Sequence, residues 1–328
     1  MTVASGNGHT DWRPTASRET LRLRAELLTR ARGFFAARGV LEVDTPIVVN
    51  VPVTDRHIQS AQVLLANGVE SRRLFLHTSP EYAMKRLLAA GSGDIYQICH
   101  VVRALERGRL HNAEFTLIEW YRSGISLGAL MSEVEELVRE LLGRTRELAS
   151  ARVSYREAFL DALALDPFTA PLAELAANAR RAGFQGAAAD RDELLELLMG
   201  TVVGPRLGRG GLTFVHGYPA SQAALARLDP EEPRAAQRFE LYCEGVELAN
   251  GFHELAAARE QRARFERDVA ERRRAGLPAT SIDERLLAAL EAGLPDCCGV
   301  ALGFDRTLML AADAAHIDAV IPFPTERA

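Results

Sequence analysis

Apolar and polar positions follow two rhythms along this chain, one typical of helices and one typical of strands. After Ser17, apolar side chains recur every three or four residues to about Arg38, which predicts an amphipathic helix that Ser17 caps and Gly39 ends. Extended and helical patterns then follow one another to the end of the chain. The further predicted elements are an extended segment at 40–51 interrupted by Pro46, a helix at 80–90 capped by Ser79, strands at 94–102, 114–122, 213–215 and 297–303, and helices at about 256–274, 282–292 and from 304.

The stretch from 127 to about 199 is rich in Ala, Leu, Glu and Arg, and its periodicity predicts helix. Strands are scattered between helices instead of alternating regularly with them. This order favours an α+β fold, with a mainly antiparallel sheet flanked by helices. Residues 1–17 are polar and predict a loosely held tail, so we expect 18–328 to form one domain that includes the helical segment at about 127–199.

Residues 239–254 combine strand-like alternation with many chemically useful side chains. Residues 244–245, Glu-Gly, predict a two-residue turn between paired strands. Pairing across this turn would place Glu240 opposite Ala249 and diagonal to Glu247. Two carboxylates on one face in this arrangement are near enough to share a cation.

The second of these strands aligns Asn250, Phe252 and Glu254, because side chains alternate between the two faces of a strand. An amide, a ring and an acid on one face suit a pocket for a small amine. The same pattern also suits an amphipathic edge hairpin with a solvated acidic face. From these residues alone the two interpretations stand level.

Composition narrows the class of protein only moderately. The chain has 328 residues, 48% of them apolar and 25% charged, and a net charge of −5, which indicates a globular protein without a nucleic-acid-binding surface. The N-terminus has no apolar core, and the chain has no long apolar run, so we expect a protein that does not enter a membrane. The four cysteines lack C-x-x-C spacing, which fits a cytoplasmic protein. Lys85 is the only lysine, and we interpret this as an effect of codon composition.

Two arginines occupy places where an anion could bind. Arg103 ends a predicted strand before the polar loop 104–112, where its guanidinium could meet a phosphate or simply belong to a solvated loop. Arg306 lies in the first turn of the last helix, an end that prefers anions, so it is either a surface arginine or the partner of an anionic ligand. The chain has no glycine-rich nucleotide motif, no catalytic triad signature and no pair of histidines with metal-ligand spacing, so a nucleotide would be held in another way.

Taken in order, these segments resemble the catalytic domain of class II aminoacyl-tRNA synthetases. The resemblance runs from about residue 18 to the end of the chain, and it implies an α+β fold and a homodimer formed through Gly39–Pro46. Residues 39–46, 103–115 and 303–306 are similar to the three motifs of the class. Further segments are similar to its lysyl-tRNA synthetase branch: Thr78-Ser-Pro-Glu81, His111-Asn112, Glu114-Phe115, Glu119-Trp-Tyr121 and residues 247–254.

The resemblance implies that an amino acid is activated by ATP and Mg²⁺ to an adenylate. Such a reaction needs no protein nucleophile, because positioning and charge neutralisation supply most of the catalysis. Arg103 and Arg306 would be the catalytic cations, on the α- and γ-phosphates. The implied ATP contacts also include Ala104, Leu105, Asn112, Phe115 stacked on adenine, Glu247, Leu248 and Gly303. The implied Mg²⁺ ligands are Glu240 and Glu247. The implied contacts with the amino acid are Ser79, Pro80, Glu81, Glu119, Tyr121, Asn250, Glu254 and Ala301.

Within the class, the chain is similar to truncated lysyl-tRNA synthetase paralogues that attach (R)-β-lysine to a lysine of elongation factor P. Its first motif begins about forty residues in, which leaves no room for an N-terminal anticodon-binding barrel, so no tRNA partner is expected. Ala301 stands where the tRNA synthetases usually have glycine, and one methyl group in a tight pocket changes substrate choice by about 1–3 kcal/mol.

The second motif departs from the family pattern. It reads Val-Arg-Ala-Leu at 102–105 and lacks the usual glutamate, so either Glu106 takes its place or the contact with ATP is lost; Ala113 also replaces a usual proline. Two other hypotheses therefore stay open. One is a lysine-activating enzyme with another acceptor, such as a tRNA or a small molecule, and the other is a non-catalytic regulatory protein that kept the fold.

Overall fold

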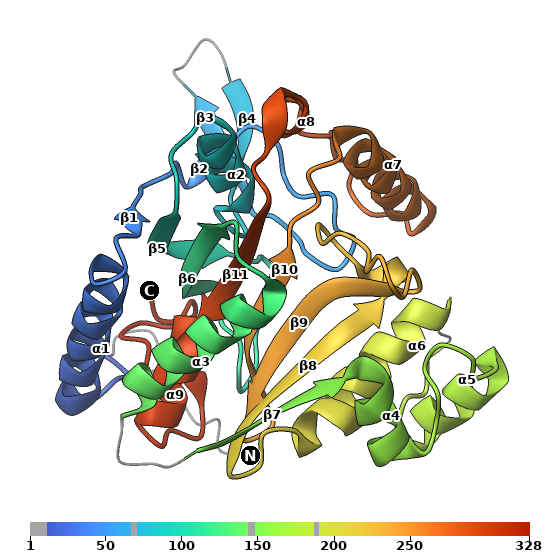
Figure 1. Ribbon diagram of the computed structural model, residues 1–328. Coiled ribbons are helices and arrows are strands. Elements are labelled where there is room, and N and C mark those ends of the chain that lie inside the picture. Colours follow the sequence, from blue (N-terminus) through green and yellow to red (C-terminus); the bar gives the residue numbers. More distant parts are fainter. Residues whose placement is uncertain (1–11, 67–70, 144–147, 187–189) are drawn as a thin grey trace, which may run out of the picture.

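A computed structural model describes residues 12–66, 71–143, 148–186 and 190–328, and an eight-stranded sheet runs through it (Figure 1). The strand order is β1-β5-β6-β11-β10-β9-β8-β7; the pairs β1·β5 and β7·β8 are parallel and all other neighbours are antiparallel. The predicted α+β fold with a mainly antiparallel sheet flanked by helices is confirmed. The strands of this sheet are β1 (Leu41–Glu42), β5 (Ile95–Val102), β6 (Glu114–Ser123), β7 (Ala149–Ser154), β8 (Gly211–Pro219), β9 (Ala235–Cys243), β10 (Val246–His253) and β11 (Cys297–Gly303).

Helices in the described residues pack around this sheet and begin close to the predicted positions. Ser17 caps the first helix by accepting a hydrogen bond from the Thr20 amide at 3.1 Å, and Gly39 follows its end with a φ of 66°, as predicted. The second helix begins one residue later than predicted, because its N-cap is Pro80 and not Ser79. The helices are α1 (Arg18–Ala36), α2 (Glu81–Ala89), α3 (Leu127–Leu142), α4 (Tyr155–Leu163), α5 (Leu172–Arg181), α6 (Arg191–Leu198), α7 (Ala258–Arg274), α8 (Glu284–Gly293) and α9 (Phe304–Ala311).

The prediction of helix throughout 127–199 is wrong at Ala149–Ser154, where β7 pairs in parallel with the edge of the sheet. The first four residues of this strand are exposed. Because neither face of β7 is well buried, its sequence lacks the apolar alternation that marks a strand. The block is therefore a helix, an edge strand and three further helices.

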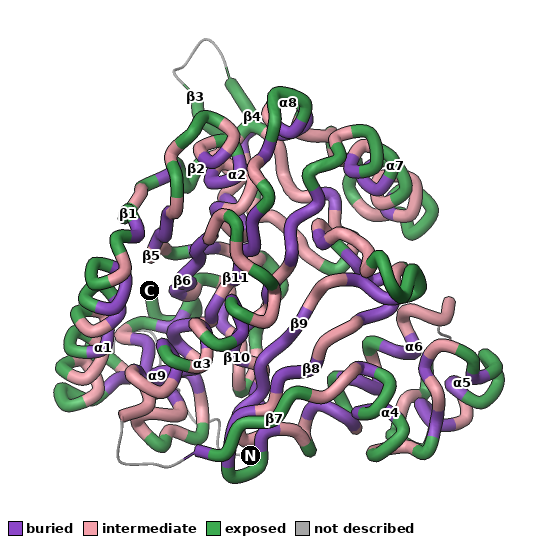
Figure 2. Tube along the Cα trace, in the orientation of Figure 1, coloured by how far each residue is buried: buried purple, intermediate pink, exposed green. Residues whose placement is uncertain are grey.

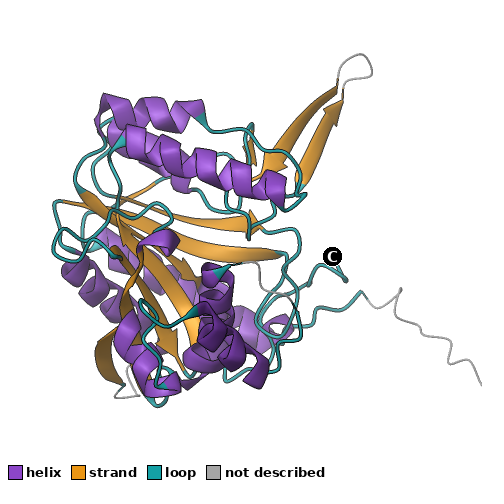
Figure 3. Cartoon of the chain, turned by 90° about the vertical axis from the view of Figure 1, so that its right-hand side faces the viewer, coloured by secondary structure: helices purple, strands orange, loops and turns teal. Residues whose placement is uncertain are grey.

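A small second sheet was not predicted from the sequence. It consists of β2 (Val48–Val49), β3 (Gln62–Ala66) and β4 (Ser71–Leu76), all antiparallel. Figure 3 shows β3 and β4 projecting from the body of the molecule. Most of their side chains are exposed, including Leu64 and Leu65, so burial leaves no periodic trace in this sequence either.

The two faces of the large sheet have different partners. Helices α1, α3 and α9 cover one face, where Ile118 and Trp120 of β6 join the main core. Buried residues follow the central strands through the molecule (Figure 2). The alternate residues of β6, Glu119 and Tyr121, point to the opposite face, which is flanked by α2, α7 and α8 and by α4–α6. No helix within the described residues has the length and apolar character that a membrane span requires.

Candidate active site

A cavity of about 390 Å³ lies on this second face of the sheet. Strands β6, β10 and β11, the segment before α2, and helices α6 and α7 all contribute residues to its walls. The fold therefore brings together side chains that are far apart in the sequence. Of the predicted site residues, Ser79, Glu81, Arg103, Glu119, Tyr121, Asn250, Glu254 and Ala301 line the cavity.

Three buried or half-buried carboxylates gather at one end of this cavity, which we call the amine end: Glu81, Glu119 and Glu254. Glu119 accepts hydrogen bonds from the hydroxyl groups of Ser79 at 2.7 Å and Tyr121 at 2.8 Å. These neutral donors hold the carboxylate in place without cancelling its charge. The amine end therefore offers negative charge to a ligand.

Lys85 supplies the cation that the sequence analysis overlooked. Its ammonium nitrogen lies 2.6 Å from a carboxylate oxygen of Glu81 and 2.6 Å from one of Glu254. This ion pair occupies Glu254 Oε2, a buried oxygen for which no other hydrogen-bond donor is present. The second oxygen of the carboxylate, Oε1, lies beside Gly299.

The electrostatics of the amine end favour a cationic ligand. Burial raises the pKa of Glu254 to about 8 and that of Glu119 to about 7, and the neighbouring charge of Glu81 acts in the same direction. Lys85 opposes both shifts because it stabilises the ionised carboxylates. Burial disfavours the charge on Lys85 itself, but Glu254 and Glu81 outweigh this effect and raise its pKa. An additional ammonium group would lower the carboxylate pKa values further.

Gly299 of β11 forms the tightest point of this end of the cavity. A methyl group at its Cα would lie 2.3 Å from the Tyr121 ring and 2.5 Å from Glu254 Oε1. Only glycine leaves both side chains in place here. Ala301, two residues along the same face, lines the cavity with the methyl group that the sequence analysis singled out.

The β9–β10 hairpin has the predicted turn, with positive φ at both Glu244 and Gly245. Its predicted register is wrong beyond the turn. A β-bulge between Glu247 and Ala249 shifts the pairing by one residue, so Glu240 lies opposite Asn250 and not opposite Ala249. The extra residue puts Glu247 on the same face as Asn250, and the hairpin therefore presents one functional face instead of two.

Arg238 lines the cavity and was not among the predicted site residues. Its guanidinium donates hydrogen bonds to the amide oxygen of Asn250 at 3.1 Å, to Glu240 at 2.5 Å and to the Gln222 carbonyl at 2.7 Å. Arg238 precedes Glu240 by two residues on β9, so the period of two that indicated Glu240 could also have indicated Arg238.

Arg103 lies at the wall of the cavity and is held from two directions. It donates to the Thr78 carbonyl at 3.4 Å and to Glu106 at 3.3 Å, and its guanidinium carbon lies 5.1 Å from the centre of the Phe115 ring. Leu105, by contrast, is 81% exposed. Glu106 is therefore the carboxylate that pairs with Arg103, and its role as a replacement for the missing motif glutamate stays a prediction.

Arg306 is fixed by backbone and side-chain acceptors around the start of α9. It donates to the carbonyl groups of Leu110 at 3.2 Å and Glu247 at 3.0 Å, and it lies 2.6 Å from His111 Nε2. Burial and this arginine lower the pKa of His111, so the neutral imidazole accepts the bond. These contacts aim a preorganised cation at the side of the sheet that carries Glu247.

The other predicted ATP contacts lie outside the cavity wall, and their roles stay predictions. Leu248 is buried in the main core, and Gly303 is the N-cap of α9. Asn112 is buried, and its amide binds the Glu114 carbonyl at 2.7 Å and the Thr325 amide at 3.1 Å, which fastens the C-terminal segment to the loop. Ala104 is exposed beside Leu105.

The two predicted Mg²⁺ ligands differ in how many hydrogen bonds and ion pairs their carboxylates already make. Glu240 accepts hydrogen bonds from Arg238 at 2.5 Å and from the Tyr242 hydroxyl group at 2.6 Å. Glu247 is 40% exposed and has only a loose ion pair with Arg306, at 3.6 Å. Within the described residues no group of three or more His, Cys, Asp or Glu side chains could hold a metal ion. One or two carboxylates together with substrate phosphates are the usual Mg²⁺ ligands, and Glu247 suits this role.

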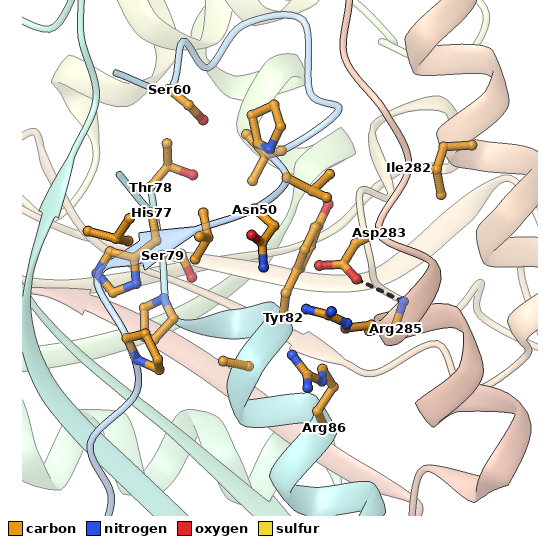
Figure 4. A pocket seen from close by; sticks show the side chains of 18 of the residues that line it. Asn50, Ser60, His77, Thr78, Ser79, Tyr82, Arg86, Ile282, Asp283 and Arg285 are labelled. Atoms are coloured by element: carbon orange, nitrogen blue, oxygen red, sulfur yellow. Dashed lines mark hydrogen bonds between the residues drawn. The ribbon is translucent and has the colours of Figure 1, made fainter. Parts of the chain in front are cut away.

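A second cavity of about 460 Å³ adjoins the first and shares Thr78, Ser79 and Tyr82 with it (Figure 4). Pro80, predicted to bind the amino acid, lines this outer cavity and not the first. Arg86 also lines it, on the helix that carries Lys85. Lys85 and Arg86, which are successive residues of α2, thus place one cation in the buried interior and one at the outer cavity.

Comparison with known proteins agrees with this geometry. The family model of class II tRNA synthetases (D, K and N) matches residues 2–327. The elongation factor P–(R)-beta-lysine ligase of Vibrio parahaemolyticus is 49% identical over 96% of this chain and 98% of its own length. The ligases of that name from Mannheimia succiniciproducens and Haemophilus influenzae are 48% and 47% identical, each over 97% of this chain and 98% of their own length. The chain therefore belongs to the class II aminoacyl-tRNA synthetase family and, within it, to the elongation factor P–(R)-beta-lysine ligases.

Proposed function

We propose that this protein uses ATP to activate (R)-β-lysine as its adenylate and transfers it to the ε-amino group of a lysine of elongation factor P. The observation that carries this proposal is the amine end of the cavity. Three carboxylates and one fixed ammonium leave two uncompensated negative charges there when all are ionised. A substrate with two ammonium groups neutralises these charges, which a monoamine or an acidic amino acid would not.

Activation joins the substrate carboxylate to the α-phosphorus of ATP and releases pyrophosphate. Arg103, at the wall of the same cavity, would attract the substrate carboxylate and the α-phosphate toward each other. Arg306, held by two backbone carbonyls, would stabilise the phosphates that leave. Mg²⁺ would be held by Glu247, with Glu240 beside it, and would offset the negative charge of the phosphates.

In the second step, a lysine amine attacks the acyl carbon of the adenylate, an amide bond forms, and AMP leaves with the bonding electrons. The amine loses a proton to solvent in this step. No protein nucleophile takes part, so rate depends on how well the cavity holds the adenylate. Because the proposed acceptor is a translation factor, we expect the protein to act in the cytoplasm.

Exposed apolar residues support a homodimer through the first-motif region. Leu41 of β1 is 55% exposed and Val48 of β2 is 36% exposed, on either side of Pro46, and Ile47 is 41% exposed. Apolar side chains of this size on adjacent segments are typical of a contact surface. Analytical ultracentrifugation of wild type and Val48→Asp tests this, with the variant expected to sediment as a monomer.

Mass spectrometry of elongation factor P tests the proposed function directly. The acceptor is incubated with the enzyme, ATP and either (R)-β-lysine or α-lysine, and a β-lysyl adduct on one lysine is expected with the first amino acid. Pyrophosphate exchange with each amino acid, and with tRNA added, separates the other hypotheses. Preference for α-lysine with charging of tRNA would refute the proposed acceptor, and no exchange with any amino acid would favour a regulatory protein.

A further inference from the structure

Lys85 stands behind the wall of the active-site cavity and does not line it. Its side chain is 1% exposed, and its ammonium bridges Glu81 and Glu254, which do line the cavity. Glu81 lies one helical turn before Lys85 on α2, whereas Glu254 follows β10. The ammonium group therefore fixes two cavity walls that come from different parts of the chain.

Stability alone does not require an ammonium group at this position. Taking charges out of water is costly, and a buried ion pair can often be replaced by apolar residues without loss of stability. The stem of Lys85 packs in the region of Met84 and Leu88, where a methionine would fill a similar volume. What an apolar residue would not supply is the positive charge between the two carboxylates.

We propose that Lys85 is a positioning residue that sets the charge of the amine end at minus two when its carboxylates are ionised, and so fits it to a substrate with two ammonium groups. The inference rests on the proposed function. Glu81, Glu119 and Glu254 contribute three negative charges, and Lys85 neutralises one of them. Lys85 pairs with only one oxygen of each carboxylate, Glu81 Oε1 and Glu254 Oε2, so the second oxygen of each carboxylate is not taken up by this cation.

Among the described residues, other titratable groups near this ion pair do not replace the Lys85 cation. Arg264 of α7 lines the cavity, but its guanidinium donates to the carbonyls of Ala224 and Ala226 and to Glu260. Tyr121 of β6 and Tyr82 of α2 are buried phenols whose pKa values burial raises well above 10. The pKa of the Cys297 thiol of β11, beside Glu254, is also raised by burial. Without Lys85, three carboxylates would face one another, the pKa of Glu254 would rise further, and a larger share of the protein would carry a protonated Glu254 at neutral pH. A protonated Glu254 cannot hold an ammonium group by charge.

Lys85→Met tests this inference, with Arg86→Met as the matched control. Arg86 is the neighbouring cation on α2 but is exposed and lines the outer cavity (Figure 4). Pyrophosphate exchange measures KM and kcat with (R)-β-lysine between pH 6 and 9. We expect Lys85→Met to raise KM for the amino acid about tenfold or more at pH 7, with kcat and KM for ATP within about twofold. In Lys85→Met, the pH at which KM is lowest should rise by about one unit, whereas Arg86→Met should match wild type.

Rescue by charge separates a positioning role from a packing role. Lys85→Arg, which keeps the cation, should retain the wild-type pH profile, and Lys85→Gln replaces Lys85→Met if the latter unfolds. A folded neutral variant with an unchanged KM and an unchanged pH profile would overturn the inference while leaving the proposed function intact. Wild type without any exchange activity would instead refute the proposed function.

Discussion

The substitution Gly299→Ala tests the geometry of the amine end with a single methyl group. The new Cβ would lie 2.3 Å from Tyr121 Cε1 and 2.5 Å from Glu254 Oε1, whereas ordinary contact begins at 3.4 Å. Both the ring and the carboxylate must therefore move by about 1 Å. Neither can move easily, because Tyr121 is hydrogen-bonded to Glu119 and Glu254 is paired with Lys85.

The size of the effect follows from this clash. Forcing an extra carbon into a packed site costs about 1–3 kcal/mol, which corresponds to a factor of about 5 to 150. A displacement of about 1 Å in a positioned group can cost about 100-fold in rate. We therefore expect kcat/KM for (R)-β-lysine in pyrophosphate exchange to fall about 10- to 100-fold, with KM for ATP nearly unchanged.

Gly251→Ala is the matched control for this measurement. Gly251 lies on the neighbouring strand, and its added Cβ would meet the Phe239 ring at 2.5 Å on the face of the sheet that belongs to the core. It should lower the thermal midpoint yet leave KM for (R)-β-lysine close to wild type. If folded Gly299→Ala has a wild-type KM and kcat, the amino acid does not bind against Tyr121 and Glu254, and the assignment of the amine end is wrong.

Three further predictions concern the same cavity. Glu254→Gln should raise KM for (R)-β-lysine at least about tenfold and leave ATP affinity intact by direct titration, because the substitution removes the charge that meets the ammonium groups of the substrate and of Lys85 but no contact with ATP. An equal loss of ATP affinity would contradict this role. Since burial raises the pKa values of Glu119 and Glu254 above those of the unfolded chain, the free protein binds more protons than the unfolded chain and should lose stability as pH rises from about 5 to 8. The thermal midpoint of the free protein should fall as pH rises over this window, and the increase in thermal midpoint that (R)-β-lysine causes should grow. A thermal midpoint that does not change with pH would show that the pKa values of these carboxylates are not raised. Glu106→Gln should raise KM for ATP several-fold if this carboxylate replaces the missing motif glutamate beside Arg103, whereas Leu105→Ala should have no effect on it.

The sequence predicted those features that depend on local patterns. The turn at Glu244–Gly245, the strand Cys297–Gly303 and the helix cap at Ser17 each follow from residue types within a few positions, and the structure has all three. The strand β7 and the projecting β3–β4 pair were missed because their residues are mostly exposed, so no buried face imposes a period on the sequence.

Many side chains that the sequence singled out line one cavity, but their arrangement was not predicted, and Lys85 and Arg238 were missed. A β-bulge adds one residue to one strand, and nothing in the alternation of Glu247, Asn250 and Glu254 reveals it. Lys85 could not be recognised as a site residue because its partner Glu254 lies far along the chain and only the folded sheet brings the two together. The spacing of four residues from Glu81 was the one local signal, and a helical pair of this kind is most often a surface feature.

The burial of Lys85 has a consequence for the chemistry of the enzyme's own surface. An acyl adenylate that escapes from its site reacts with exposed primary amines, and lysine side chains are the usual targets on proteins. This chain has a single lysine, 1% exposed and bridged by two carboxylates, and every other basic side chain apart from histidine is a guanidinium that stays protonated. No lysine side chain is therefore exposed to the reactive intermediate, and we expect little acylation of the enzyme's own side chains.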